Sequence, residues 1–512
     1  AFAFFCPPLK ASIFFRIIFS LFSFKGSTHI SLILIILNIF VFFLNVGAFY
    51  LYGQDSFYIN REGIYLVSII ALQVHISLIN RRLRSDPFVI ILSFITIVYY
   101  CFRVFTLLIF NASDTFIRNE AYTSSDTTHT LYLIFLFNFF MLFAFYLVPI
   151  NKIQRFKFSS RNYNHFIDTL LLFATLLLLL HMSGFWSYFI SISRFSQAAF
   201  SLINIHWIIY FIFFILIKRS SLSFSVLKSH KIFIFILLFI QSLWLIVGGS
   251  RGYLVFFIEI ILIGILSLGR FRLNNYHLFK AFLLAPILLL SLYIMFMFAS
   301  DQRKAPDITG KIEGIVENIE GFIYRHQEGS DEIRSHLRKL TNRIGYLDMP
   351  AEILSNKDKY EFIFSPSFYA KSFTDNLLTP GFDIFDTPKV SRSLYFVHQN
   401  KNNNIPSKDF GIKNDIHHSD MLTIYGEFFM IFSWLSLLIV FIFAYFLKWL
   451  YYLKFKAKDF GLVAFVRPTI LLYFYFSLNS FGVDWIISTY IVPIISTLII
   501  FMVYHKIFFK SQ

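Results

Sequence analysis

Long apolar runs separated by short polar segments most limit what this chain can fold into. Each run approaches the roughly 20 residues that an α-helix needs to cross the hydrocarbon core of a bilayer. Hydrophobic residues make up 57% of the chain and charged residues only 14%, which excludes a disordered chain and an ordinary soluble enzyme. The sequence therefore predicts an all-α polytopic integral membrane protein. We predict twelve transmembrane helices, over residues 30–52, 64–80, 87–111, 130–150, 166–184, 200–217, 232–249, 252–269, 281–299, 421–447, 468–483 and 485–505.

The basic residues of the short loops fall mainly on one side of these spans. By the positive-inside rule, that side is cytoplasmic, and so are both termini. The net charge of +16 is then a topology signal and an attraction to anionic lipid, with no nucleic acid as partner. The predicted cytoplasmic segments that carry this excess are 1–29, 81–84, 152–161, 218–231, 270–280, 448–467 and 506–510.

Four regions follow from this layout. Residues 1–29 carry Lys and Arg among Phe and Ile, and we expect an N-terminal interfacial segment. Residues 30–299 hold the first nine transmembrane helices and 421–512 the last three, of which the final two could form a re-entrant pair. Between them, residues 300–420 form one large periplasmic loop. Its first part has helical periodicity, whereas turns and irregular structure are expected over 346–420.

Several familiar chemistries have no motif in this chain. There is no phosphate-binding GxxxxGK[ST], no dinucleotide-binding GxGxxG and no HExxH. The two cysteines, Cys6 and Cys101, lie in apolar stretches, so we predict neither a metal site nor a cofactor. The string at 248–252 matches GxSxG, but it follows a membrane span and not a strand, so a hydrolase nucleophile elbow is not expected.

That same string, Gly-Gly-Ser-Arg-Gly, ends at the predicted outer face between two spans. Its glycines permit a tight turn and a close approach by a ligand. The planar fork of Arg251 can hold a phosphate or pyrophosphate through two parallel hydrogen bonds. The alternative is an arginine that snorkels from a simple hairpin turn.

A second polar group closes the long loop, where His417, His418, Ser419 and Asp420 lead directly into a span. A histidine at the outer mouth of a span can act as a general base near neutral pH. Two alternatives are open. One is that the segment only caps the following helix through Ser419 or Asp420, and the other is that the paired histidines bind a metal weakly.

Other charged residues are candidates for contact with substrate. Arg103 and Glu259 lie within predicted spans, where an ionisable residue usually faces a cavity or the bundle interior. We expect both to share a polar, outward-open chamber with Arg251; a structural ion pair is the alternative for each. In the loop, Arg343 and Arg392 are the best candidates for a ligand contact, although either could be solvated or paired with a nearby acid.

This arrangement resembles the superfamily of bacterial O-antigen polymerases (Wzy-type) and O-antigen ligases. The likeness rests on the number of spans, the Ser250-Arg251-Gly252 turn, the long late external loop and His418 with Ser419 at its end. It implies a metal-independent glycosyltransferase of the bacterial inner membrane that polymerises undecaprenyl-pyrophosphate-linked oligosaccharide repeat units at the periplasmic face. Arg251 would then contact the diphosphate and His418 would act as base. Membrane lipid and a polysaccharide chain-length regulator are the further partners it implies.

Three alternatives to a polymerase stay open. Gly426 follows His418 more closely than the glycine of the ligase pattern does, which favours polymerase over ligase, while the paired arginine loop motifs described for some polymerases are absent. Another lipid-linked-sugar glycosyltransferase would use acids such as Asp55 and Glu62 in the first external loop. A non-enzymatic flippase or transporter predicts two similar halves, which the chain lacks.

Overall fold

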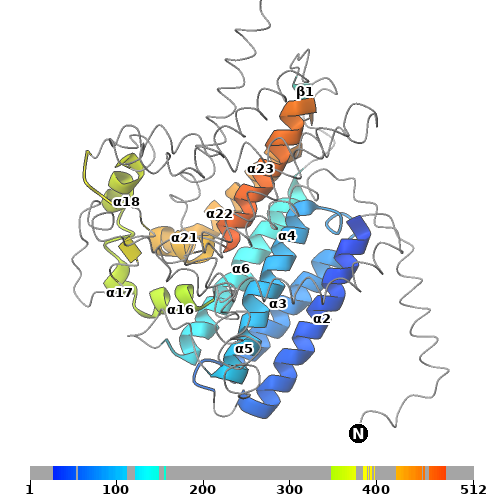
Figure 1. Cartoon of the computed structure of the whole chain (residues 1–512), viewed down its shortest axis with the longest axis vertical. Helices are drawn as coiled ribbons and strands as arrows, with labels where there is room; N and C mark the ends of the chain where they lie inside the picture. The colour runs from blue at the N-terminus through cyan, green and yellow to red at the C-terminus, as the bar shows by residue number, and fades with distance from the viewer. Residues whose placement is uncertain are drawn as a thin grey trace, which may run out of the picture.

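The computed structural model describes about two fifths of the chain. The described residues are 27–53, 56–111, 122–148, 155–156, 347–375, 384–388, 390, 393–394, 397, 423–452, 454–455 and 460–479. This part is almost entirely helical and forms a bundle with a group of shorter helices along one side (Figure 1). Five helices within it are long and apolar enough to cross a membrane. The predicted spans between 166 and 299, the span 485–505 and segment 1–26 lie outside the described residues.

The first four of these five helices follow one another in the first third of the chain. They are α2 (Ser27–Tyr52), α3 (Arg61–Ile79), a continuous rod made of α4 (Pro87–Ile95), the π-helical segment η3 (Thr96–Cys101) and α5 (Phe102–Phe110), and α6 (Ser124–Leu147). Each of these helices agrees with a predicted span. Polar capping residues, however, place the first residue of α3 and of α6 earlier than predicted. Asn60 accepts a hydrogen bond from the Gly63 amide, and Thr123 forms a capping box with Asp126, so α3 and α6 begin before their apolar runs.

The fifth candidate span follows the long loop. It consists of α21 (Ile424–Phe432), a single 3₁₀ turn, η6 (Ser433–Leu435), and α22 (Ser436–Tyr452). Ser433 has a φ of 49°, which interrupts the α-helical path. Helix α23 (Phe460–Asn479) packs against α4 and α22 and contains Pro468. Two-residue strands β1 (Arg155–Phe156) and β2 (Lys454–Phe455) pair in parallel beyond α6 and α22, so the chain segments that follow these two helices meet.

The described part of the long loop is more helical than the sequence analysis predicts. Helices α16 (Asp348–Ser355), α17 (Lys357–Tyr360) and α18 (Pro366–Phe373) occupy a stretch expected to be mainly turns. The prolines of this stretch favour turns in the sequence analysis. Pro350, however, lies in the first turn of α16, where the backbone amides have no partner within the helix, so proline is tolerated there. Pro366 starts α18, and the Ser365 hydroxyl accepts a hydrogen bond from the Phe368 amide. The prediction of turns was therefore wrong for 348–355, 357–360 and 366–373, whereas the turn at 361–365 agrees with it.

Candidate functional site

Arg103 forms the main link between the long loop and the bundle. It lies on α5, and its side chain is fully buried, as is that of Asp348 at the start of α16. The guanidinium Nε donates to Asp348 Oδ1 at 3.0 Å and Nη2 donates to Oδ2 at 2.6 Å. Nη1 donates to Thr106 Oγ1 at 3.2 Å. A bidentate pair of this kind fixes both distance and orientation, so α16 is fixed against α5.

Tyr122 adds a third group to this pair. It lies just before α6, is fully buried, and packs its ring against Tyr58 at 5.1 Å between centroids. Burial raises the pKa of the Tyr122 hydroxyl well above its usual range; the Asp348 charge adds to the rise and the Arg103 charge opposes it. Among the described residues, the buried Tyr122 hydroxyl makes no hydrogen bond.

Two buried glutamates lie in the loop helices and in α21. Glu352 of α16 accepts a hydrogen bond from the Tyr360 hydroxyl at 3.0 Å. Glu427 of α21 accepts one from the Tyr369 hydroxyl. Both carboxylates are fully buried, and such groups need polar partners because an isolated buried charge costs several kcal/mol. The tyrosines supply these partners and tie α17 to α16 and α18 to α21.

Apolar contacts complete the junction between loop and bundle. Met349 and Ile353 of α16 pack in one cluster with Val390, Leu394 and Met430. The Asp375 carboxylate fixes the described segment 384–388, because it accepts hydrogen bonds from the backbone amides of Ile384 and Thr387. Two stretches of the long loop, around 348 and 390, thus pack together with α21, which follows the loop. Figure 1 shows α16 beside α6 and α21.

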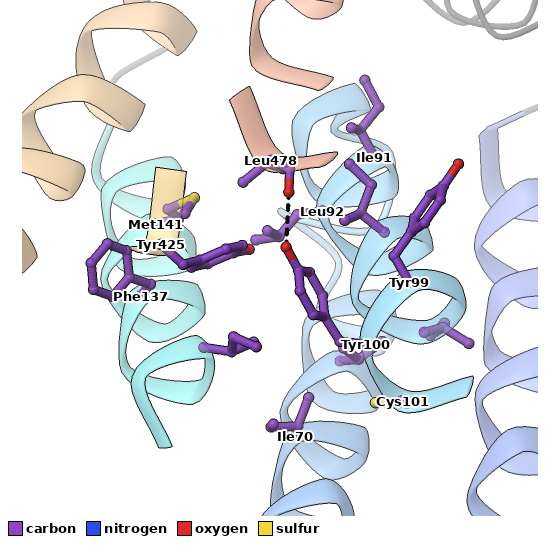
Figure 2. Close-up of a cluster of buried hydrophobic side chains, with 14 of the residues drawn as sticks. Ile70, Ile91, Leu92, Tyr99, Tyr100, Cys101, Phe137, Met141, Tyr425 and Leu478 are labelled. Atoms are coloured by element: carbon purple, nitrogen blue, oxygen red, sulfur yellow. Dashed lines mark hydrogen bonds between the residues drawn. The ribbon is translucent and has the colours of Figure 1, made fainter. Parts of the chain in front are cut away.

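A buried aromatic layer lies beneath this junction, at the π-helical segment of the third span. A π-turn widens the helix locally and often marks functional positions. Here it presents Tyr99 and Tyr100 to two other helices. The Tyr100 hydroxyl donates to the Leu478 carbonyl at 2.9 Å, and its ring meets that of Tyr425 edge to face (Figure 2). Tyr425 in turn donates to Asn138 Oδ1 at 2.9 Å, so the start of α21 is bonded to α6.

A second buried ion pair lies about 25 Å along the third span from the first, given a rise of about 1.5 Å per residue. Lys448 of α22 pairs with Asp86, which caps α4 by accepting from the Phe88 amide at 3.0 Å. Lys448 also donates to the Phe145 carbonyl of α6. Lys448 was predicted to lie in a cytoplasmic loop; the structure instead places it within α22, fully buried.

Of the six predicted site residues, only Arg103 is described. The structure satisfies its guanidinium with Asp348 and Thr106, in the form of the structural ion pair that the sequence left as an alternative. Arg251, Glu259, Arg343, Arg392 and His418 lie outside the described residues, so their roles and the shared chamber stay predictions. Three described residues are nevertheless close in sequence to predicted site residues. Asp348 follows Arg343 by five positions, Val390 precedes Arg392 by two, and Thr423 follows His418 by five.

Sequence reasoning missed Asp348 and Glu352 and gave Glu427 no role; all three are acids within largely apolar helices. The available signal was a carboxylate among apolar neighbours, in DMPAEILS for α16 and in IYGEFFMIF for α21. Within the described ranges, no three His, Cys, Asp or Glu side chains are grouped as a metal site would need. Comparison with family models, curated proteins and solved structures found no match to this chain.

Proposed function

We propose that this protein is a glycosyltransferase that polymerises undecaprenyl-pyrophosphate-linked oligosaccharide repeat units at the periplasmic face of the bacterial inner membrane. The proposal assumes twelve transmembrane spans, cytoplasmic termini and an external loop at 300–420. The proposed reaction involves no metal ion. The proposal rests on the resemblance of the sequence to O-antigen polymerases and on one structural observation. The described part of the long loop packs against the helices of the bundle and is held there by a buried ion pair.

That observation concerns two stretches of the loop, around 348 and 390, and helix α21, which follows the loop. Asp348 is held by Arg103, Val390 lies in the same apolar cluster as Met349, and Glu427 is bonded to Tyr369. These stretches adjoin Arg343, Arg392 and His418 in the sequence. A loop that served only as a connector would not need a buried bidentate ion pair. A loop that carries catalytic groups does need one, because misplacement of about 1 Å can cost 10²-fold in rate.

In the proposed reaction, an acceptor hydroxyl oxygen attacks the anomeric carbon of the donor sugar. A new glycosidic C–O bond forms, and the bond from that carbon to the lipid pyrophosphate breaks. The hydroxyl proton passes to His418 as general base. The pyrophosphate leaves with the bonding electron pair, and the guanidinium of Arg251 stabilises the charge that develops, with Arg343 and Arg392 as further contacts. Glu259 lines the proposed substrate chamber, whereas Arg103 holds α16 in place through Asp348.

Polymer ladder length in liposomes that contain the purified protein and lipid-linked repeat units tests this proposal. Arg251→Lys should fail nearly as badly as Arg251→Ala, because lysine cannot make the bidentate contact. His418→Ala should lower the rate by about 10²–10⁴-fold, as loss of a general base does.

Two matched controls accompany these variants. His417→Ala removes the adjacent histidine, and Arg270→Ala removes an arginine from a predicted cytoplasmic loop; both should leave the ladder unchanged. A full-length ladder from Arg251→Ala would rule out the diphosphate contact. A normal ladder from His418→Ala would reduce that histidine to a helix cap.

A further inference from the structure

A groove between α3 and α6 is open on the surface of the part of the bundle that the structure describes. It has a volume of about 360 Å³, and its walls are almost entirely apolar. At its floor, Gln73 Nε2 donates to the Phe135 carbonyl at 3.3 Å, which holds the two helices together. The side chains that form the two walls are Ile69, Leu72 and Ile76 on α3 and Phe139, Phe143 and Tyr146 on α6.

The groove ends at a turn rich in arginine. Residues 80–86 are fixed by backbone hydrogen bonds from Leu83 and Arg84 to the Asn80 carbonyl. From this turn, the Arg82 guanidinium lies 4.6 Å above the ring of Tyr146, and Nη2 donates weakly to the Val148 carbonyl at 3.4 Å. Arg82 is exposed, so its other N–H groups face outward at the groove's end.

The length of the groove matches one leaflet. From Ile69 to Asn80 the α3 side runs for about 16 Å at the helical rise of about 1.5 Å per residue, roughly half of the 30 Å hydrocarbon core. An acyl chain in the groove would therefore carry its headgroup to the level of the arginine turn. By the positive-inside rule this is the cytoplasmic leaflet, opposite to the face proposed for polymerisation.

Charge favours an anionic headgroup. Arg81, Arg82 and Arg84 lie in one turn, and the nearby acid in the sequence, Asp86, is buried and paired with Lys448. A guanidinium binds a phosphate through parallel hydrogen bonds, and basic residues near the membrane surface attract anionic lipid. The large aromatic and aliphatic side chains of the walls differ from the small residues typical of helix–helix contacts in membranes, which argues against a second copy of this chain as occupant.

We propose that this groove is a binding site for an anionic glycerophospholipid, with one acyl chain between α3 and α6 and the phosphate on Arg82. Arg81 and Arg84 add charge at the same level. The site is separate from the proposed polymerisation site and does not depend on it.

Native mass spectrometry of the purified full chain with phosphatidylglycerol or phosphatidylcholine tests the site. Wild type should retain phosphatidylglycerol in preference. Arg82→Gln should weaken phosphatidylglycerol retention about fivefold, the effect of one basic residue near an anionic headgroup, and leave phosphatidylcholine unchanged. Arg61→Gln is the matched control, because Arg61 is an exposed arginine at the other end of α3 that lies 5.5 Å above the ring of Tyr65.

A second variant fills the groove without touching the arginines. Ile76 is 59% exposed, and Ile76→Trp should lower retention of phosphatidylglycerol, whereas Ile36→Trp on α2, at a 48% exposed position outside the groove, should not. Equal losses from Arg82→Gln and Arg61→Gln would overturn the headgroup contact. Full lipid retention by Ile76→Trp, or a wild-type oligomer that Ile76→Trp dissociates, would overturn the lipid as occupant.

Discussion

Each of the two ends of the third span carries a buried ion pair, and the two pairs differ in construction. Arg103 and Asp348 meet through two parallel hydrogen bonds and join a span to the long loop. Asp86 and Lys448 meet as carboxylate and ammonium, and the ammonium is also bonded to the Phe145 carbonyl. The first pair therefore fixes an orientation, whereas the second supplies a compact charge that three elements share.

This difference suggests different roles. A planar fork is required where a loop helix must be held at one angle, and a point charge is sufficient where helices are already packed together along their length. We therefore expect the Arg103–Asp348 pair to control the loop and the Asp86–Lys448 pair to control only the stability of the bundle. Four variants, ordered from the largest expected effect to the smallest, test this distinction.

Arg103→Met should have the largest effect. It leaves the Asp348 carboxylate buried without its cation, and removal of one partner of a buried pair costs about 3–5 kcal/mol. Denaturant titration in detergent micelles measures this loss, and limited proteolysis should show cleavage within 347–375. The double variant Arg103→Met/Asp348→Leu should recover most of the stability; equal instability in both variants would show that the pair is not the cause.

Lys448→Met should be slightly milder, at about 3 kcal/mol, because Asp86 keeps its hydrogen bond from the Phe88 amide. Unlike Arg103→Met, it should not expose the loop at 347–375 to protease. If both variants release the loop equally, the distinction between the two ends fails.

Arg103→Lys tests the fork itself, because it preserves the charge. Lysine cannot reach both carboxylate oxygens of Asp348 in parallel, and the loss of one hydrogen bond to a charged group costs about 1.5–3 kcal/mol. The same titration measures the cost, and proteolysis reports whether α16 is still held. An unfolding curve identical to wild type would show that charge alone holds the loop.

The two pairs also show what the sequence could reveal. An arginine inside an apolar run signals burial and a partner, which the structure confirms for Arg103. The identity of that partner could not be predicted, because Asp348 is 245 positions away and is brought near by tertiary packing. Lys448 was assigned to a loop because a lysine at the end of an apolar run usually reaches water; here Asp86 compensates its burial.

Helix existence was easier to predict than helix limits. The rod from Pro87 to Phe110 agrees with the predicted 87–111, since a Pro start and a left-handed Asn111 mark its ends. The π-helical segment at Thr96–Cys101 has no such mark in the sequence, because it depends on the tyrosines meeting α21 and α23. Of the candidate site, the sequence predicted one described residue, Arg103, and missed the carboxylates that surround the loop junction.

Tyr425→Phe should have the smallest effect and concerns the layer between the two ends. The change removes one hydroxyl and leaves Asn138 Oδ1 buried without the hydrogen bond it accepts from Tyr425, a cost of about 1–3 kcal/mol. The ring is preserved, so its edge-to-face contact with Tyr100 should persist. Tyr100→Phe is the matched control: it loses the bond to the Leu478 carbonyl and also preserves its ring. Because Tyr425 lies in the first turn of α21, close in sequence to His418, Tyr425→Phe should shorten polymer ladders more than Tyr100→Phe does at similar stability. Equal ladders from the two variants would show that the layer stabilises the bundle without positioning the end of the loop.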